Sequence, residues 1–412
     1  SGNLSSNQKE GSFTLNSKNL ELEMSDFLSA SEIQLDRAKG EISWSKQKNG
    51  WLINAKQMQL SNSEITTNFD LSYLIGAPKQ ADQMTLDMEF VKAKLASAHR
   101  YLPVTMDKDS RQYLSKAFES GEIQSGTLHI KGDPDQIPFP TGQAGELTLH
   151  LPISKAIYKP SPLLPTNQGI WSAFTNVSGN IDMKQSTLTV DIDKAAYKKV
   201  ALANVRAQIP NVSAKQMTLL INGVANGDGS DMLDYLFASP VGIQQPHLAK
   251  NLSLTGPVNL DLGIKIPLSG SDDANFDAKL MLPGNKVQWE GIPPLENLKG
   301  RIRITENNPE FEDVSANFLG GALKIASAPS AANNTSFTIS GDINASFIKD
   351  YFLANTKSQI HPALLTAMSG STKYDGLINF NKSGSQTNLK FDLRNWASAA
   401  PEPAKKLAGS PM

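Results

Sequence analysis

The sequence predicts a mostly β protein: an elongated, curved and twisted antiparallel sheet with short helical interruptions and one apolar face. Three observations lead to this prediction. Apolar residues recur at every second position along most of the chain, which is the period of a strand with one wet and one apolar face. A motif in which a glycine precedes an alternating run of apolar residues occurs more than once. Runs and turns indicate roughly twenty strands but only three short helical segments, too few to cover such a sheet.

The most informative motif is an Asn-x-x-Gly sequence that precedes an alternating strand. It opens residues 297–304 (NLKGRIRI), and a near-copy opens residues 176–183 (NVSGNIDM). A weaker copy lies at residues 38–44 (AKGEISW). Because glycine tolerates the backbone conformations of tight turns, each copy predicts a turn that leads into a strand.

The first 75 residues alternate almost throughout and predict successive strands. Ile42 and Trp44 form one period-two set, and Trp51 and Ile53 form the next. Between them, Asn49-Gly50 is a two-residue hairpin signal. Later in the chain, a strand is predicted over residues 85–91.

Helical segments follow this first set of strands. Residues 95–102 are predicted to form a short helix that Pro103 ends, because the residue before a proline is displaced from the helical conformation. Asp107 or Asp109 can cap a second helix, and Ser120-Gly121 is expected to end it.

The helical interruption recurs twice more. Residues 226–231 (NGDGSD) predict a turn and an N-cap before the second copy. In the third copy, Pro362 lies near the first turn of a second helix, and Ser369-Gly370 is expected to end that helix. Each of the three helical segments carries a tyrosine at an equivalent place, Tyr101, Tyr235 and Tyr351. We expect these helices to plug or gate the edge of the trough that the uncovered apolar face of the sheet would form.

One unit of about 120–130 residues therefore repeats, which is longer than the common solenoid periods. Its order is strand, Leu-Pro turn, strand, Asn-x-x-Gly strand, hairpins, two short helices and a return strand. The expected division is the end of a preceding repeat (1–37), three repeat units (38–132, 133–268 and 269–382) and the start of a further repeat or a tail (383–412).

Composition excludes several classes of protein. Lys+Arg at 39 and Asp+Glu at 40 nearly cancel, which argues against a nucleic-acid partner. The absence of Cys excludes disulfides, thiolate metal sites and a cysteine nucleophile, and it suits an oxidising compartment. No apolar run reaches the ~18 residues that span a bilayer, and no signal peptide opens the chain.

Motifs for catalysis or metal binding are missing from the sequence. The 5 His have no metal-ligand spacing, and His129 and His150 are expected on a solvated strand face. Residues 273–277 begin like a calcium loop but lack its later Gly and Glu, so we expect a solvated hairpin tip. No nucleophile elbow, phosphate loop or dinucleotide fingerprint occurs. The sequence predicts no enzyme, no catalytic residue, no metal and no cofactor.

An uncovered apolar face predicts a trough in which a chain-like apolar ligand takes the place of the missing layer. Which strand face lines the trough depends on register, because a one-residue slip exchanges the two faces. Each candidate is alternatively an ordinary core residue. The predicted lining residues are alternating aliphatic and aromatic side chains: Ile42, Trp44, Ile181, Met183, Leu188, Val190, Ile192, Leu260, Leu262, Ile264, Ile266, Leu280, Leu282, Ile302, Ile304, Phe337, Ile339, Ile378 and Phe380.

A family resemblance rests on three features. They are the Asn-x-x-Gly strand openings, residues 229–240 (GSDMLDYLFASP), and residues 391–394 (FDLR) followed by Pro401, Pro403 and Lys405. The chain resembles the AsmA-like family of bacterial inter-membrane lipid transport proteins, which includes TamB and YhdP, and within that family it is similar to a YhdP-like segment. The resemblance covers nearly the whole chain.

The resemblance implies a repeating β-groove of the bridge-like lipid transfer type. It implies that the groove holds phospholipid acyl chains for transport between the inner and outer membranes, which supports outer-membrane lipid homeostasis. It also implies a periplasmic location, with the parent protein anchored in the inner membrane by an N-terminal helix that this segment lacks. Phospholipid is then the partner, both membranes are reached through other parts of the parent protein, and no protein partner is indicated.

Two other classes of function stay open on the sequence. One is a β-solenoid scaffold or interaction protein with a filled core and no lipid. The other is a glycan-active β-helix enzyme, which needs clustered carboxylates on one wet face.

Overall fold

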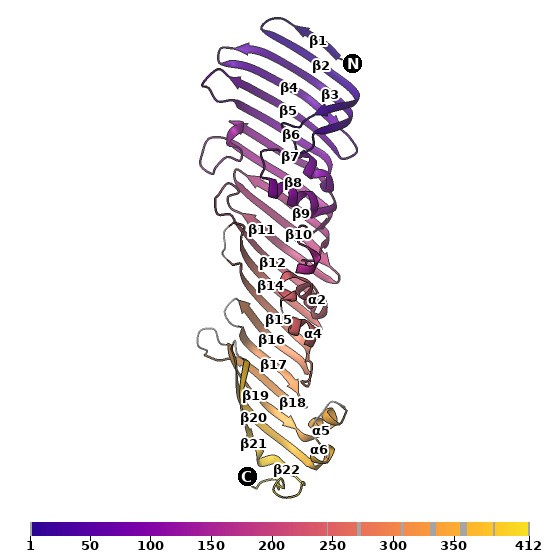
Figure 1. Cartoon of the computed structure of the whole chain (residues 1–412), viewed down its shortest axis with the longest axis vertical. Coiled ribbons are helices and arrows are strands. Elements are labelled where there is room, and N and C mark those ends of the chain that lie inside the picture. Colours follow the sequence, from indigo (N-terminus) through magenta and orange to yellow (C-terminus); the bar gives the residue numbers. More distant parts are fainter. Residues whose placement is uncertain are drawn as a thin grey trace. The chain divides into compact units, whose positions relative to one another are not determined.

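The computed structural model describes residues 2–244, 246–269, 273–305, 309–329, 335–354, 361–381 and 384–410. Among these residues, 22 strands form an antiparallel sheet that does not close on itself (Figure 1). The described helices are few and short, and the longest contain 10 residues each. The prediction of a mostly β fold with short helical interruptions is confirmed.

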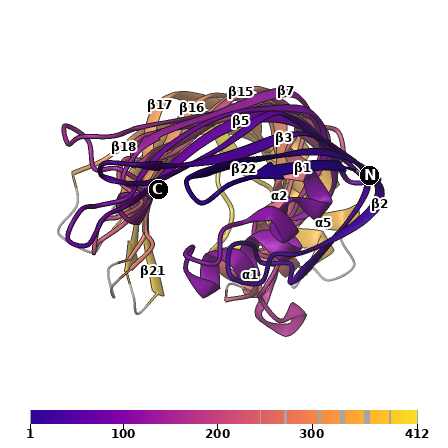
Figure 2. The same cartoon turned by 90° about the horizontal axis from the view of Figure 1, so that it is seen from above.

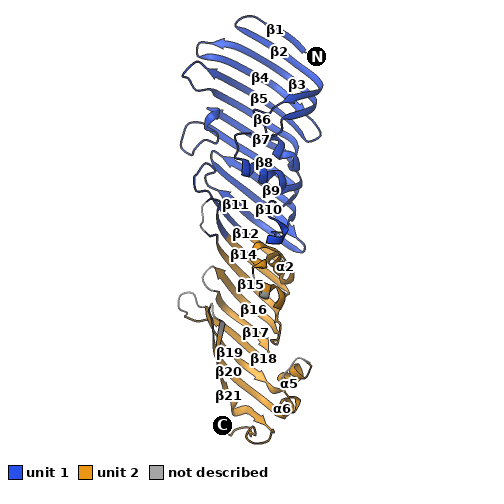
Figure 3. Ribbon diagram, viewed as in Figure 1, with its two compact units in different colours: residues 1–223, 264–274 blue, residues 224–263, 275–412 orange. Residues whose placement is uncertain are grey.

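The chain divides into two compact units (Figure 3). Unit 1 comprises residues 1–223 and 264–274, and unit 2 comprises residues 224–263 and 275–412. β12 (Thr218–Asp228) and β14 (Pro257–Pro267) are each divided between the two units, and every other element belongs to one unit.

Unit 1 is a meander in which each strand from β1 to β11 pairs antiparallel with the next. Figure 2 shows that these strands arch and that α1 lies inside the arch. The elements are β1 (Gly2–Ser6), β2 (Glu10–Glu23), β3 (Glu32–Gln47), β4 (Gly50–Ser61), β5 (Ile65–Gly76), β6 (Gln83–Lys94), η1 (Leu95–Tyr101), α1 (Lys108–Ala117), β7 (Phe118–Gly132), η2 (Pro134–Gln136), β8 (Glu146–Tyr158), η3 (Thr166–Gln168), β9 (Phe174–Lys184), β10 (Thr187–Tyr197) and β11 (Val200–Ile209).

Unit 2 has the same antiparallel plan from β15 to β21. Its elements are α2 (Gly229–Ala238), α3 (Pro240–Ile243), α4 (Pro246–Asn251), β13 (Leu252–Thr255), β15 (Asn275–Trp289), β16 (Leu295–Thr305), β17 (Glu310–Phe318), β18 (Gly321–Ser327), β19 (Thr335–Asn344), α5 (Ala345–Ala354), α6 (Pro362–Ala367), β20 (Met368–Asn381), β21 (Gly384–Asp392), η4 (Leu393–Asn395) and β22 (Trp396–Ser398).

The Asn-x-x-Gly motif lies inside strands, so the predicted turn is wrong. Asn176 in β9 and Asn297 in β16 have left-handed φ values of 54° and 53°. The ladder between β16 and β17 shifts register across Asn297, which is the mark of a β-bulge. A bulge bends its strand and increases the local twist.

The glycine of the motif allows the backbone of the neighbouring strand to approach closely, because it has no side chain. A Cβ on Gly300 would lie 2.7 Å from the Cα of Val314, and a Cβ on Gly179 would lie 2.0 Å from the carbonyl oxygen of Asp191. Left-handed residues of this kind recur in strands of both units, and we attribute the bending of those strands to them. They are Asn19, Gln57, Ser125, Lys155, Asn176, Asn204, Asn297 and Asp313.

The first hairpin differs from its prediction by one residue. Gln47 pairs with Gly50, so the two turn residues are Lys48 and Asn49. Gly50 is already in β4, where an added Cβ would lie 1.9 Å from the carbonyl oxygen of Ile75. The glycine is therefore required by the close approach of β5.

The helix starts are confirmed and two predicted helix stops are wrong. Asp107 caps α1 by accepting a hydrogen bond from the Ser110 amide at 2.8 Å, and Asp228 caps α2 in the same way through Ser230. Pro362 opens α6 as predicted. Ser120-Gly121 and Ser369-Gly370, however, lie within β7 and β20, because each chain segment passes from helix to strand without a loop.

Candidate functional site

One face of unit 1 is apolar across its strands. Residues that pair directly across an antiparallel ladder lie on the same face, so the register identifies the members of that face. One row crosses eight strands: Leu4, Phe13, Ile42, Ala55, Leu71, Leu86, Ile130 and Leu147. A second row crosses β4 to β11: Met58, Phe69, Met88, Leu128, Leu149, Met183, Leu188 and Ile209.

The residues predicted in this part of the chain belong to the same face. Ile42 and Met183 are members of the two rows, and Trp44 pairs with Ile53 beside the first row. Val190 pairs with Ile181, which pairs in turn with Leu151. The predicted residues of unit 1 within β3, β9 and β10 are all half-buried, and they are Ile42, Trp44, Ile181, Met183, Leu188, Val190 and Ile192.

Unit 2 has an apolar face of the same kind. Leu280 pairs with Ile302, which pairs with Phe311, and the ring of Phe311 lies 5.4 Å from that of Phe337. A further row runs through Val314, Ile325, Ile339, Gly376 and Leu389. The register thus brings together the predicted residues Leu280, Leu282, Ile302, Ile304, Phe337, Ile339 and Ile378.

The remaining predicted residues lie in β14 and β20. Leu260 and Leu262 (unit 2) and Ile264 and Ile266 (unit 1) are half-buried. They alternate with exposed polar residues such as Asp261 and Lys265. The backbone of Phe380 pairs with Thr335, and its side chain lies outside the part that the structure describes.

Some members of these apolar faces are covered and others keep exposed surface. In unit 2, Leu282 is only 4% exposed, but Ile304 is 38% exposed and Leu389 on β21 is 42% exposed. In unit 1, the members of the second row from Leu128 to Leu188 remain half-buried. Apolar side chains that keep this much exposed surface in a continuous row can accept an apolar partner.

The helix η1 covers one part of the face in unit 1. Its Leu95, Ala98 and Tyr101 pack against a buried cluster that includes Ile123 and Ile153. The 3₁₀ geometry, with three residues per turn, places Leu95, Ala98 and Tyr101 on the same side of the helix. The prediction that the Tyr101 helix lies at the trough is consistent with this packing.

Glu64 fastens η1 to the hairpin between β4 and β5. Arg100 donates two hydrogen bonds to its carboxylate, at 2.8 Å and 2.9 Å, and the Tyr101 hydroxyl donates a third at 2.9 Å. Burial by itself would raise the pKa of Glu64, but the hydrogen bonds from Tyr101 and Arg100 outweigh burial, so the pKa is lowered.

We expect Glu64→Gln to lower the free energy of unfolding by about 2 kcal/mol at pH 7, because charge-assisted hydrogen bonds are lost. The pKa of Glu64 is lower in the folded chain, so its contribution is complete above the unfolded value and is lost as the pH falls through the folded value. The difference from the wild type should therefore begin to shrink as the pH falls below the unfolded value of about 4.3, and it should vanish only once the pH is below the lower folded value. Urea unfolding at several pH values measures it. Glu41→Gln, at an exposed position of β3, should change stability by less than about 0.5 kcal/mol.

The Pro-rich loop of residues 133–140 also covers the face. Phe139 is completely buried and packs with Ile130 and Leu147, and Met84, Leu86 and others surround them. Pro-rich composition is typical of a loop, but it gives no reason to place the aromatic ring of Phe139 in the core.

The opposite faces carry polar and charged side chains that pair across strands. His129 lies 2.7 Å from Asp87, and His150 lies 2.6 Å from Asp182, which agrees with the predicted solvated positions. Arg303 binds Asp277 at 2.9 Å, and this hydrogen bond lowers the pKa of Asp277. Asp277 therefore lies in β15 beside an arginine, so the hairpin tip predicted for residues 273–277 is wrong for residues 275–277, which belong to the strand.

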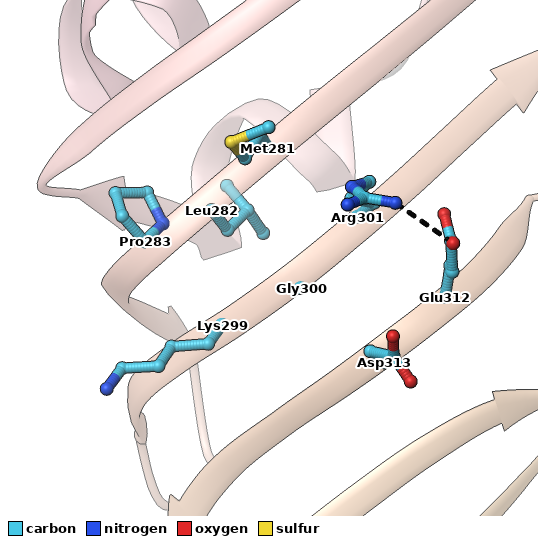
Figure 4. A pocket seen from close by; sticks show the side chains of 8 residues that line it. All are labelled: Met281, Leu282, Pro283, Lys299, Gly300, Arg301, Glu312 and Asp313. Atoms are coloured by element: carbon cyan, nitrogen blue, oxygen red, sulfur yellow. Dashed lines mark hydrogen bonds and ion pairs between the residues drawn. The ribbon is translucent and has the colours of Figure 1, made fainter.

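A shallow cavity of 280 Å³ lies over Gly300 in unit 2 (Figure 4). Several residues around it, including Met281 and Arg301, lie on the ion-paired face, where Arg301 binds Glu312 at 2.9 Å. Lys299 and Arg301 are the cationic side chains that line the cavity.

Within the described ranges, no three His, Asp or Glu side chains come together as metal ligands. No described helix has the length and apolar character that crossing a bilayer requires.

Comparison with known proteins gives one family. The family model described as YhdP protein matches residues 1–412. The intermembrane phospholipid transporter YhdP of Escherichia coli (strain K12) is 24% identical over 421 residues, which cover 100% of this chain and 32% of that protein. The chain thus spans only part of the length of this relative. No solved structure matches the chain.

Proposed function

Because the chain belongs to the YhdP protein family, we propose that it is a segment of a phospholipid transporter and that its apolar faces hold acyl chains. The relative in Escherichia coli is an intermembrane phospholipid transporter, which supplies the class of ligand. The observation that supports the proposal most directly is the pair of eight-residue apolar rows across unit 1, in which the members of the second row from Leu128 to Leu188 remain half-buried.

The energetics suit a transported lipid. Each buried methylene contributes ~0.8 kcal/mol, so an acyl chain of about sixteen carbons is worth on the order of 10 kcal/mol. Removing a lipid from a bilayer costs a similar amount. If contact with the apolar face recovers most of this free energy, a lipid on the protein has nearly the same free energy as a lipid in the bilayer. The face therefore provides a path for transfer and affects its rate. Direction requires a gradient, a partner or an energy source elsewhere.

We place this segment in the periplasm, as the family indicates. In our proposal the parent protein is anchored in the inner membrane through an N-terminal helix outside this chain, and it delivers phospholipid toward the outer membrane, which supports lipid homeostasis there. The lipid head groups would lie at the wet edge of each apolar face, and acyl chains would lie against the strands.

We also propose that the chain is built from repeats with the boundaries given above. In three places a strand leads into short helices and a return strand: after β6, after β12 and after β19. The compact units have other limits, since one compact unit can contain more than one repeat.

Catalysis is not part of this proposal. The strand-face carboxylates Asp191, Asp277 and Glu312 are bound to arginines, so they are poorly placed as a general acid and base pair. A filled scaffold is disfavoured by the exposure of Leu389 and Ile304.

The experiment is to purify the intact parent protein and measure its bound lipid by native mass spectrometry and solvent extraction. We expect phospholipid to co-purify in stoichiometric amounts. A protein that is folded but carries no lipid, and takes up none from phospholipid vesicles, would favour the scaffold and contradict the proposal.

A further inference from the structure

Three chain segments of unit 1 meet at a cavity of 410 Å³. They are the connection between β2 and β3, the helix η1 and the helix α1. Ser29 ties the first segment to the end of η1, since its amide and its hydroxyl both donate to the Leu102 carbonyl, at 2.8 Å and 3.0 Å. The residues that line the cavity are Ser29, His99, Lys108, Arg111, Gln112 and Ser115.

The lining of this cavity is basic and contains no carboxylate. Among the described residues, Lys108 has no carboxylate within ion-pair distance. Arg111 donates one hydrogen bond, from Nε to the Met106 carbonyl at 3.0 Å, which fixes the guanidinium while Nη1 and Nη2 have no partner in the described part of the chain. By contrast, the guanidinium groups of Arg206 and Arg303 are bound to carboxylates.

His99 adds a third nitrogen group. Its Nδ1 donates a hydrogen bond to the Ala96 carbonyl at 3.0 Å, which fixes the orientation of the ring. On α1, Lys108, Arg111 and Ser115 are spaced by three and four residues, which places them on one side of the helix. An oriented guanidinium with unused donors, beside an ammonium, is suited to the oxygens of a phosphate group.

The cavity borders the apolar face. Leu95, Ala98 and Tyr101 occupy the side of η1 that packs on the sheet, and His99 follows Ala98 by one third of a turn. The basic cavity and the apolar face are therefore separated only by the width of η1. A phospholipid has the same two parts, an anionic phosphate and apolar chains.

We propose that this cavity binds a phosphate group, and specifically the head-group phosphate of a phospholipid whose acyl chains lie on the apolar face of unit 1. This inference rests on the proposed function for the origin of the phosphate. Lys108 and Arg111 supply the charge, and Gln112 supplies a neutral donor at the same opening.

The test uses the intact parent protein and the double variant Lys108→Ala/Arg111→Ala. Lys116→Ala is the matched control, because Lys116 lies in the last turn of the same helix and does not line the cavity. Three probes are titrated: phosphatidylglycerol, diacylglycerol with the same chains, and inorganic phosphate. Circular dichroism checks that the β content is unchanged.

We expect the double variant to bind phosphatidylglycerol at least about tenfold more weakly than the wild type, because charge-assisted hydrogen bonds are lost. Diacylglycerol binding, and all binding by Lys116→Ala, should be unchanged. Equal losses for both lipids, or no loss for phosphatidylglycerol, would overturn the inference. Loss of inorganic phosphate alone would also overturn it, because the cavity would then be a site for free phosphate.

The same titrations separate this inference from the proposed function. If the wild type binds neither lipid, the proposed function fails. If the wild type binds both lipids and the double variant binds them equally well, the acyl-chain proposal stands and the head-group site is rejected. Arg111→Lys provides a second variant with the charge retained, and we expect a smaller loss because the forked geometry is removed.

Discussion

Replacing Leu149 with Asp should reduce phospholipid retention by the intact parent protein at least about tenfold, because a carboxylate is costly in contact with hydrocarbon. Leu149 lies in the middle of the second apolar row, between Leu128 and Met183, and it is half-buried. A charge there would interrupt the apolar row on both sides. Native mass spectrometry of the purified variant measures the lipid that remains.

The matched control is Thr148→Asp. Thr148 precedes Leu149 in β8, lies on the opposite face, and pairs with His129 and Lys184, beside which a carboxylate is well placed. This variant should retain lipid like the wild type. A Leu149→Ser variant separates charge from loss of packing, and we expect an intermediate loss. Equal retention by Leu149→Asp and Thr148→Asp, with unchanged β content, would remove this face from the lipid path.

Gly179→Ala should lower the free energy of unfolding by about 3 kcal/mol, because the added methyl group has no space. Its Cβ would lie 2.0 Å from the Asp191 carbonyl oxygen and 2.7 Å from the Cα of Ile192, and both are backbone atoms that cannot turn aside. The strands β9 and β10 would have to separate at the bulge. Urea denaturation monitored by circular dichroism gives the change.

Gly142→Ala separates the free-energy cost of a steric clash from the cost of backbone strain. Gly142 has a φ of 84°, and an added Cβ there meets nothing within 4 Å. Only the backbone strain of a left-handed residue applies, which costs about 1–2 kcal/mol. Equal losses at the two positions would show that the spacing of β9 and β10 adjusts freely and that the motif glycine does not fix it.

The sequence predicted the fold class because an alternating pattern has one simple structural solution. The apolar set of β9 and β10 could be assigned to one face from Ile181, Met183 and Val190 alone, and the ladder between the strands agrees. Helix starts were predicted for a similar reason, since the cap at Asp107 is a local interaction.

Interactions between distant segments could not be predicted in this way. Asn176 and Asn297 were interpreted as turn residues, but they form bulges within strands. A bulge depends on how neighbouring strands bend together, which the local sequence does not specify. The burial of Phe139 and the bonds of Glu64 to Arg100 join segments with no local pattern in common. The basic cavity was missed because Ser29 and Arg111 are far apart in the sequence, and no spacing rule relates them.

The most direct test of the account is a photo-crosslinking scan along β9 in living cells. A crosslinking residue is placed in turn at positions 180, 181, 182 and 183 of the intact parent protein, and covalent phospholipid adducts are detected by mass spectrometry. We expect adducts at Ile181 and Met183, on the apolar face, and none at Asn180 and Asp182, on the opposite face. Adducts that are absent at all four positions, or equally abundant at all four, would contradict the claim that acyl chains lie on this face.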